Sequence, residues 1–501
     1  MLKKLKVLMV TSEMLPFAKE GGLADVVGSL SVELAKSGHD VRVVMPKYGS
    51  ISDTTFTDLG KTLSVPMGCI GTVDSGVFKC KLPGAKGTVY FIDNKQYFGR
   101  EGGLYSDIHG TGFLDNDNRF VFLSRAALEL CKLLKFKPDI IHVHDWHTAA
   151  VPVFINKAYH EDPFIGEAAT VLTIHNLQHQ GEFYEGLMDV LGIGWEHFNY
   201  LCLEKDGNTN LLKGAIYNAT TITIVSESYA REILTPEFSF GLDGVLRERS
   251  GDLVGILNGV DYEQWNPETD SLIASKYSDT DMSGKALCKS DLQKTFGLPE
   301  RPDVPLIGIV TRLVKQKGIN LLAEAVCNIL EMDIQIVLLG TGEVWANFFF
   351  GDLPNRAKDR FACYIGYDNT LAHKTEAGAD FFLMPSEFEP CGLNQMYSMR
   401  YGTIPIVRSV GGLNDTVENF DETNGTGTGF KFYDFTATAL QNTVGWAVHS
   451  YYNNRDKLEA LKRRIMKIDF SWKNAAVKYE NLYYDSVKKR IGETIFEKRF
   501  H

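Results

Sequence analysis

The chain has 501 residues, of which 44% are hydrophobic and 23% are charged. This balance is that of an ordinary globular protein, and it excludes a disordered or fibrous chain. The 63 acidic residues outnumber the 52 Lys and Arg residues, and the net charge of −11 argues against non-specific binding of nucleic acid. The eight cysteines form no Cys-x-x-Cys motif, which disfavours a zinc ribbon or a disulfide scaffold. No apolar stretch is long enough for a signal peptide or a membrane span, so we expect a cytoplasmic protein with no membrane partner.

The N-terminus predicts a strand–helix–strand unit. Residues 5–10 form a short apolar run suited to a buried strand, and the apolar positions of 23–34 fall at helical spacing before Gly38, which predicts the end of the helix. Residues 41–44 predict a second strand. Because crossovers of this kind are right-handed, the two strands should be parallel.

The same rhythm returns along the chain. Helical patterns such as 319–330 separate further apolar runs, and Ser226 is a plausible helix cap. The further predicted strands are residues 139–144, 171–174, 221–225, 306–310, 334–339, 380–384 and 404–407. This alternation predicts an α/β fold with mostly parallel sheets. A polar stretch at 261–305 interrupts it, so we expect two sheets of similar size, one on each side of roughly residue 255. Ligands should lie at the carboxyl ends of the strands, in the cleft between the two domains.

Two motifs in the first half follow predicted strands. Lys19, Gly21 and Gly22 lie where the first helix begins, and backbone N–H groups, the helix N-terminus and the lysine charge suit an anion there. A tight turn is the alternative, and the motif is neither Gly-x-Gly-x-x-Gly nor a Walker loop. The segment 142–147, His-Val-His-Asp-Trp-His, has two interpretations: a zinc site built on its histidines, or hydroxyl binding by Asp145 and His147. Periodicity does not decide between them.

Other motifs also follow predicted strands. His175 alone is more often a structural residue than a catalyst, whereas Arg312 and Lys317 on one loop, with Gly318 opening a helix, suit a diphosphate. A solvated basic turn is the alternative. As an exposed, cleft-lining side chain, Lys317 should contribute little to stability. The remaining motifs are Glu389-Pro390-Cys391-Gly392-Leu393 and Gly411-Gly412-Leu413. Together these loops are more informative than any one of them.

In this order, from Lys19 to Trp472, the motifs resemble those of the bacterial glycogen synthases and the related starch synthases. Related nucleotide-sugar transferases often carry a second glutamate eight residues after the first, and here that position is Tyr397, as in the glycogen synthase branch. The resemblance implies a GT-B glycosyltransferase, an α/β protein with two Rossmann-like domains that face each other across a deep cleft. Its domains would be an acceptor-side domain at 1–253, a donor-side domain at 254–475 and a helical segment at 476–501 that packs back on the first domain.

The resemblance implies retaining transfer of glucose from ADP-glucose to the non-reducing end of an α-1,4-glucan such as glycogen, with no metal or other cofactor. Lys19, Arg312 and Lys317 would hold the diphosphate, His175 would lie beside the transferred glucose, and Glu389 would bind its hydroxyls. The other residues that the resemblance assigns to the site are Gly21, Gly22, Asp25, Asp145, Asn258, Cys391, Gly392, Leu393, Gly411, Gly412 and Leu413, the last three supplying backbone N–H groups near the phosphates.

Several alternatives stay open at this point. UDP-glucose as the donor, a sucrose synthase-like transferase, a metal-dependent hydrolase built on His142 and His144, and a sugar-binding protein without turnover each fit part of the pattern. Cys391 is expected to be a packed thiol and not a nucleophile, because the sequence places no base next to it. For the transfer itself we favour front-face attack over a covalent intermediate. The sequence does not indicate the oligomeric state.

Overall fold

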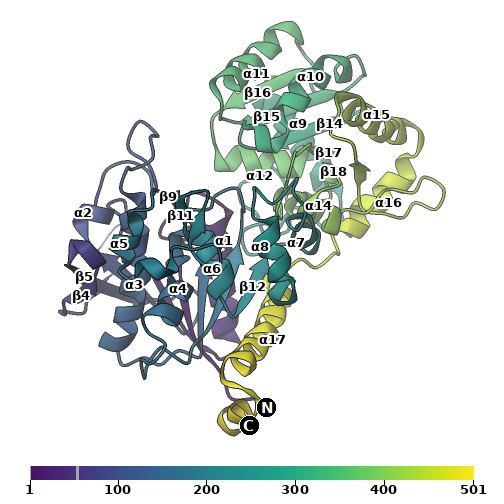
Figure 1. Ribbon diagram of the computed structural model, residues 1–501. Coiled ribbons are helices and arrows are strands. Elements are labelled where there is room, and N and C mark those ends of the chain that lie inside the picture. Colours follow the sequence, from purple (N-terminus) through teal and green to yellow (C-terminus); the bar gives the residue numbers. More distant parts are fainter. Residues whose placement is uncertain (1, 52–55) are drawn as a thin grey trace. The chain divides into compact units, whose positions relative to one another are not determined.

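The computed structural model describes residues 2–51 and 56–501, which form two compact units (Figure 1). The first unit comprises Met1–Val225, Ala230–Gly259 and Trp472–His501, and the second comprises Ser226–Tyr229 and Val260–Ser471. Residues 254–259 and 472–475, which the sequence analysis assigned to the second domain, therefore group with the first unit.

The first unit is built on a mixed sheet with the strand order β13-β12-β8-β7-β1-β2-β6-β5-β3, to which β4 adds by pairing with β5. The strands from β13 to β6 are parallel, whereas β5 runs antiparallel to β6, β3 and β4. The strands are β1 (Lys6–Val10), β2 (Asp40–Pro46), β3 (Thr57–Asp58), β4 (Leu63–Pro66), β5 (Thr72–Lys81), β6 (Thr88–Asp93), β7 (Ile140–His144), β8 (Ala169–Ile174), β12 (Thr221–Ile224) and β13 (Leu253–Gly255).

Helices cover this sheet, and a small separate sheet is formed by β9 (Glu182–Phe183), β10 (Glu204–Lys205) and β11 (Asn208–Asn210). Helices α3, α4 and α6 pack next to one another, whereas α1 packs against α17 (Figure 1). The helices are α1 (Gly22–Lys36), α2 (Lys95–Phe98), α3 (Asn116–Leu133), α4 (Ala150–Lys157), α5 (Leu187–Leu191), α6 (Leu211–Asn218), α8 (Asp243–Glu248), α17 (Trp472–Ile491) and α18 (Glu493–Phe500). Helix α7 (Glu227–Glu232) begins among the residues that group with the second unit.

The second unit contains a wholly parallel sheet with the strand order β16-β15-β14-β17-β18-β19. Its strands are β14 (Leu306–Val310), β15 (Gln335–Gly340), β16 (Phe361–Ile365), β17 (Phe381–Met384), β18 (Ile404–Arg408) and β19 (Phe430–Phe432). Its helices are α9 (Ser283–Thr295), α10 (Ile319–Ile329), α11 (Val344–Arg356), α12 (Asn369–Gly378), α13 (Asn394–Arg400), α14 (Gly411–Thr416), α15 (Ala437–Asn453) and α16 (Arg455–Ile465). The α/β class with mostly parallel sheets is confirmed.

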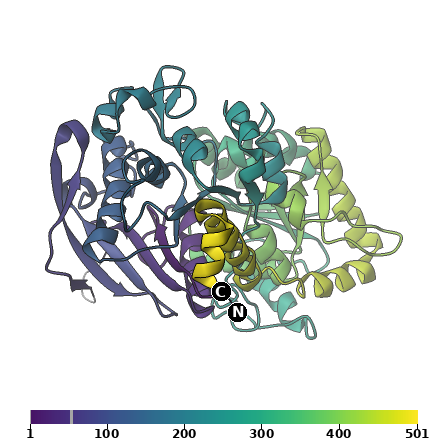
Figure 2. The same cartoon turned by 60° about the horizontal axis from the view of Figure 1, so that its bottom comes forward.

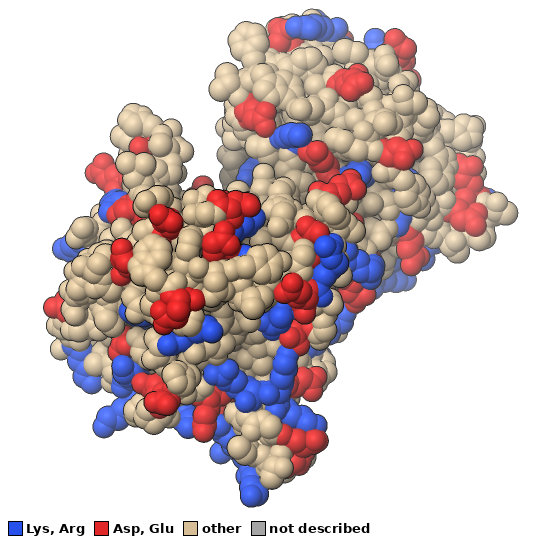
Figure 3. Space-filling view, viewed as in Figure 1, with Lys and Arg blue, Asp and Glu red and all other residues tan. Residues whose placement is uncertain are grey.

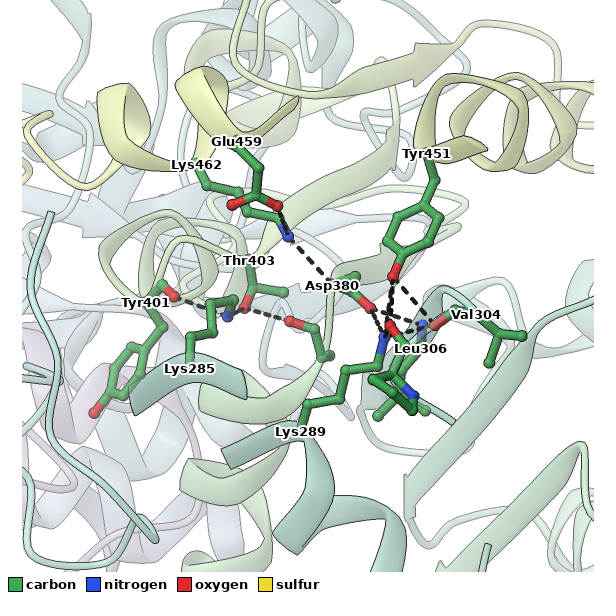
Figure 4. A network of polar contacts seen from close by, with 12 residues as sticks. Lys285, Lys289, Val304, Leu306, Asp380, Tyr401, Thr403, Tyr451, Glu459 and Lys462 are labelled. Atoms are coloured by element: carbon green, nitrogen blue, oxygen red, sulfur yellow. Dashed lines mark hydrogen bonds and ion pairs between the residues drawn. The ribbon is translucent and has the colours of Figure 1, made fainter. Parts of the chain in front are cut away.

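Helix α9 is held against the rest of the second unit by buried lysines (Figure 4). Lys289 lies 2.7 Å from Asp380, which also accepts a 3.2 Å bond from Lys462. The nearby cations hold the pKa of Asp380 well below its usual range despite burial of the carboxyl. Lys285 donates to the carbonyls of Ala377 and Tyr401, which lie at the C-terminal ends of α12 and α13. The two lysines on the buried face of this polar helix therefore have polar partners: Lys289 is in an ion pair, and Lys285 is hydrogen-bonded to carbonyls.

The two chain ends meet in the first unit (Figure 2). The backbone N–H of Lys3 donates to the carbonyl of Phe500, and the Tyr484 hydroxyl donates to the carbonyl of Lys3. Lys and Arg side chains gather near these ends, but acidic side chains lie among them (Figure 3), as in the 2.6 Å pair of Lys488 with Glu493. Within residues 2–51 and 56–501, no helix is both long and apolar enough to span a membrane.

Candidate active site

In the first unit, the loop between β1 and α1 is organised by a buried carboxylate. One oxygen of Glu13 accepts the backbone N–H groups of Glu20 and Gly21 at 2.5 and 3.0 Å, and the other accepts the Tyr105 hydroxyl at 3.0 Å. Burial raises the pKa of Glu13, and these bonds oppose that rise. Gly21 is in an extended conformation, so that Gly22 begins α1. Glu13, which the sequence analysis did not select, therefore fixes this turn and already accepts two of its backbone N–H groups. The predicted anion contact of the turn stays a prediction.

Lys19 and Asp25, both predicted site residues, form an ion pair of 2.9 Å at the start of α1. The Lys19 side chain is 45% exposed, and the Asp25 side chain is 17% exposed. The lysine is thus held near the helix N-terminus, where an anion is also favoured by the helix dipole.

His142 is a structural residue. Its two ring nitrogens lie 2.7 Å from the Tyr483 hydroxyl and 2.6 Å from the Thr173 hydroxyl, and the side chain is fully buried. Burial lowers its pKa to about 3, so the ring is neutral at pH 7. Because both nitrogens have hydroxyl partners, neither is available to a metal, and the described residues contain no group of three or more potential metal-binding side chains. The structure therefore gives His142 no role as a zinc ligand.

Asp145 and His175 are brought together at the ends of β7 and β8. One Asp145 oxygen accepts the backbone N–H of His175 at 2.7 Å, and the Asp145 backbone takes a φ of 54°. Burial raises the pKa of Asp145 to about 7, which the backbone hydrogen bonds only partly offset. The His175 ring lies 3.1 Å from His144, and burial lowers the pKa of His175 to about 3. The site thus contains a neutral His175 ring and, hydrogen-bonded to the His175 backbone, a carboxyl group with a pKa near 7.

Three further side chains, at or just after the ends of strands of this sheet, keep a buried polar atom without a hydrogen-bond partner in the part of the chain that the structure describes. They are His144 at Nε2, His147 at Nδ1 and Asn258 at Oδ1. His147 packs in an aromatic cluster, with its ring centroid 4.5 Å from that of Tyr105 and 4.7 Å from that of Phe120. Buried polar atoms of this kind require an explanation, and ligand hydroxyls at the strand ends would provide one.

In the second unit, the loop after β14 carries the predicted cations. Arg312 is exposed, and Lys317 lies in the turn before α10, with Gly318 at a φ of 70° as its N-cap. The Lys317 ammonium lies 2.6 Å from Oε2 of Glu389, whose side chain is only 6% exposed, and the Ser386 hydroxyl donates to the same oxygen at 3.1 Å. The expectation that Lys317 is a freely exposed side chain is wrong, because the lysine neutralises a buried carboxylate.

The glycines after β18 permit a close backbone approach. Gly411 has a φ of 47°, and a Cβ atom there would lie 1.9 Å from the carbonyl oxygen of Glu389. A Cβ atom on Gly412 would lie 2.0 Å from the carbonyl oxygen of Cys391. The N–H of Gly412 donates to Glu389, and that of Leu413 donates to Val410. These two N–H groups are therefore used within the protein, and the glycines also pack α14 against the Glu389 loop. The predicted role of Gly411, Gly412 and Leu413 near the phosphates stays a prediction.

The loop 391–393 is equally well fixed. Cys391 is buried, and its carbonyl accepts the Gln395 side-chain amide, as does the carbonyl of Gly392. Gly392 has a φ of 71°, a conformation that glycine adopts without strain. Leu393 is the N-cap residue of α13. The predicted contacts of these residues with a donor stay predictions.

The predicted residues thus form two groups, one in each unit. The first contains Lys19, Gly21, Gly22, Asp25, Asp145, His175 and Asn258, and the second contains Arg312, Lys317, Glu389, Cys391, Gly392, Leu393, Gly411, Gly412 and Leu413. Sequence reasoning missed Glu13 and Ser386, although each lies just after a strand, the position from which it selected the other motifs.

Comparisons with known proteins match both units. Residues 6–248 match the family model "Starch synthase catalytic domain", and residues 292–464 match "Glycosyl transferases group 1". The chain is 60% identical over 501 residues to glycogen synthase 1 of Geobacter metallireducens, covering 100% of this chain and 99% of that protein. It is also 60% identical over 499 residues to glycogen synthase 1 of Geobacter sulfurreducens, covering 99% of each. The solved catalytic domain of starch synthase IV from Arabidopsis thaliana, bound to ADP and acarbose, has a TM-score of 0.89 and 34% identity, and covers 97% of this chain and 100% of that one.

Proposed function

Because the chain belongs to the family of bacterial glycogen synthases and starch synthases, glycosyltransferases of the GT-B fold, we propose that its substrates are ADP-glucose and an α-1,4-glucan. Glucose is transferred to the non-reducing end of the glucan with retention, and ADP is released. The observation that carries this proposal is the ion pair of Lys317 with the buried Glu389, on loops that follow β14 and β17. The loop after β14 also carries the exposed Arg312. It presents cations for a diphosphate next to an acceptor of sugar hydroxyls.

The leaving group is the first element of the proposed mechanism. As the bond between the anomeric carbon and the diphosphate oxygen breaks, negative charge grows on that oxygen. Lys317 and Arg312 stabilise this charge, and their effect is largest where water is excluded. Glu389 holds the Lys317 ammonium in place before the donor binds, so little reorganisation is needed in the transition state.

The sugar is the second element. The anomeric carbon acquires oxocarbenium character, as in glycoside hydrolysis. His175 is a neutral ring because burial lowers its pKa, so it adds no positive charge beside this carbon. The acceptor hydroxyl then attacks on the face from which the diphosphate departs, forming the new carbon–oxygen bond, and its proton passes to the departing phosphate oxygen. This front-face step gives retention without a protein nucleophile.

ADP-glucose is preferred to UDP-glucose in this proposal because the curated relatives are bacterial glycogen synthases and the structural neighbour was solved with ADP. The reaction needs no metal or other cofactor, since Arg312 and Lys317 supply the positive charge, and we expect it to occur in the cytoplasm.

One assay tests the proposal. Nucleotide release is measured from ADP-glucose and from UDP-glucose, each with and without glycogen, and the product glucan is digested to identify its linkage. We expect ADP release only when glycogen is present, and new α-1,4 linkages. Release of nucleotide without glycogen, or a clear preference for UDP-glucose, would contradict the proposed acceptor or donor respectively.

A further inference from the structure

A four-residue turn, Ser226–Tyr229, follows β12 of the first unit in the sequence but groups with the second unit. The turn begins α7, and the Ser226 hydroxyl accepts the backbone N–H of Tyr229 at 3.2 Å, as a helix cap does. Ser226 is fully buried and Ser228 is 4% exposed. The chain therefore leaves the first unit for one turn and is tightly packed where it does so.

Both serines bond to the loops that carry the proposed donor site. The Ser226 hydroxyl donates to the carbonyl of Pro390 at 2.6 Å, directly after Glu389. Ser228 donates its backbone N–H and its hydroxyl to the two oxygens of Asp415, at 2.8 and 2.5 Å, and Asp415 lies in α14. The Asn414 amide donates to the Ser228 hydroxyl at 2.8 Å.

These bonds connect three segments of the chain to one another. The Glu389–Cys391 loop and α14 already contact each other, because Gly412 donates its N–H to the carbonyl of Glu389 at 3.1 Å. The Ser226–Tyr229 turn bonds to each of them, so three segments hold one another. A shift of the turn would move the backbone of Glu389, and with it the carboxylate that holds Lys317.

We propose that Ser226 and Ser228 are positioning residues for the donor site, with Asp415 as the acceptor that holds Ser228. They act through Glu389 and its partner Lys317 and do not themselves touch the substrate. The inference rests on the proposed function. It adds that two serines that follow β12 in the sequence hold the donor-binding loops of the second unit in position.

The chain offers a matched control. Ser239 is fully buried and its hydroxyl donates to Asp243 at 3.2 Å at the start of α8, so it repeats the serine–aspartate pair before a short helix. It belongs to the first unit and bonds to no donor-site loop. A purely structural role for Ser228 predicts that Ser228→Ala and Ser239→Ala behave alike.

The experiment compares Ser228→Ala, Ser228→Thr and Ser239→Ala in the full chain. It measures ADP affinity by calorimetry, the KM values for ADP-glucose and glycogen, and unfolding in urea. Ser228→Ala is expected to weaken ADP binding and raise the donor KM by about two- to tenfold, the effect of one lost hydrogen bond, with the glycogen KM unchanged. Ser228→Thr, which retains a hydroxyl, should restore both values. Ser239→Ala should change neither, although it also lowers stability.

The inference is overturned if Ser228→Ala binds ADP as the wild type does, or if Ser239→Ala weakens ADP binding equally. Should Ser228→Ala fail to fold, Asp415→Asn removes the charge while keeping an oxygen for the Ser228 N–H, and the same shift in ADP affinity is expected. Failure of the proposed function gives a different result, because the wild type would then not transfer glucose from ADP-glucose, whereas ADP affinity would still report on the turn.

Discussion

Replacement of Lys317 by Gln separates its pairing with Glu389, which the structure shows, from its proposed stabilisation of the leaving diphosphate. Its ammonium lies 2.6 Å from Glu389, whose side chain is 6% exposed, and its own side chain is 19% exposed. Removing one partner of a fully buried pair costs about 3–5 kcal/mol, because the other charge is left uncompensated. Since Lys317 is partly exposed and Ser386 still donates to Glu389, we expect a loss of roughly 1–3 kcal/mol in the free energy of unfolding.

The double variant Lys317→Gln/Glu389→Gln tests the origin of that loss. With both charges removed, most of the stability should return, giving a coupling energy of roughly 1–3 kcal/mol in a double-mutant cycle. Activity should not return with it. Loss of a group that stabilises charge in the transition state typically lowers kcat by about a hundred- to a thousandfold, and the double variant still lacks the cation.

Urea unfolding and initial rates of ADP release measure the two effects. Lys315→Gln is the control, because Lys315 lies in the same turn but forms a weaker ion pair. Its side chain is 69% exposed, and its ammonium lies 3.8 Å from the nearer oxygen of Glu387. We expect it to change the free energy of unfolding by less than about 0.5 kcal/mol. If Lys317→Gln is no less stable than Lys315→Gln, the buried pair contributes nothing. If Lys317→Gln keeps kcat near that of the wild type, its ammonium does not stabilise the leaving group.

Three further predictions concern metal ions, acid stability and packing. A chelator should leave glucosyl transfer nearly unchanged, and loss of transfer that zinc or magnesium restores would contradict the proposed role of the cations. Because the pKa of His142 is about 3 in the folded state, the unfolded chain binds more protons than the folded chain between about pH 6.5 and pH 3. The free energy of unfolding should therefore decrease as the pH is lowered through this range. In urea unfolding, His142→Gln should reduce the slope of this dependence by up to about 1.4 kcal/mol per pH unit. Gly411→Ala would place a Cβ atom 1.9 Å from the Glu389 carbonyl oxygen, so we expect markedly lower thermal stability together with weaker ADP binding, and wild-type values for both would refute the packing role.

The sequence predicted much of the fold because parallel strands are buried on both faces and therefore appear in the sequence as continuous apolar runs. The predicted strands at 5–10 and 41–44 correspond to β1 (Lys6–Val10) and β2 (Asp40–Pro46), and the helix between them corresponds to α1. Helix α9 was not predicted, because lysines with buried partners take the place of apolar residues on its packed face. Hydrophobic periodicity cannot detect burial of that kind.

For the site, the position of a residue after a strand was the informative signal. The sequence did not show which side chains from different loops contact each other. Lys317 and Glu389 were each selected from their own loops, but they are 72 residues apart, and no local pattern shows that their side chains meet. Gly411 was selected as a supplier of backbone N–H groups, and the structure adds that it permits a close approach of two loops, which the sequence did not show. In both cases the deciding fact is a tertiary contact, which one sequence does not contain.

Both lysines assigned to the diphosphate are paired with carboxylates in the free protein, Lys19 with Asp25 and Lys317 with Glu389. Each pair orders a long side chain before the donor arrives, which reduces the entropy lost on binding. Each also neutralises a charge that would otherwise attract any polyanion. A simple phosphate must compete with the carboxylate for the lysine and gives the carboxylate no new partner. A nucleotide sugar offers diphosphate oxygens to the cation and hydroxyl donors to the carboxylate, so both members of the Lys317 pair keep a partner. Selectivity for a sugar-bearing diphosphate therefore follows from the pair and not from the lysine alone.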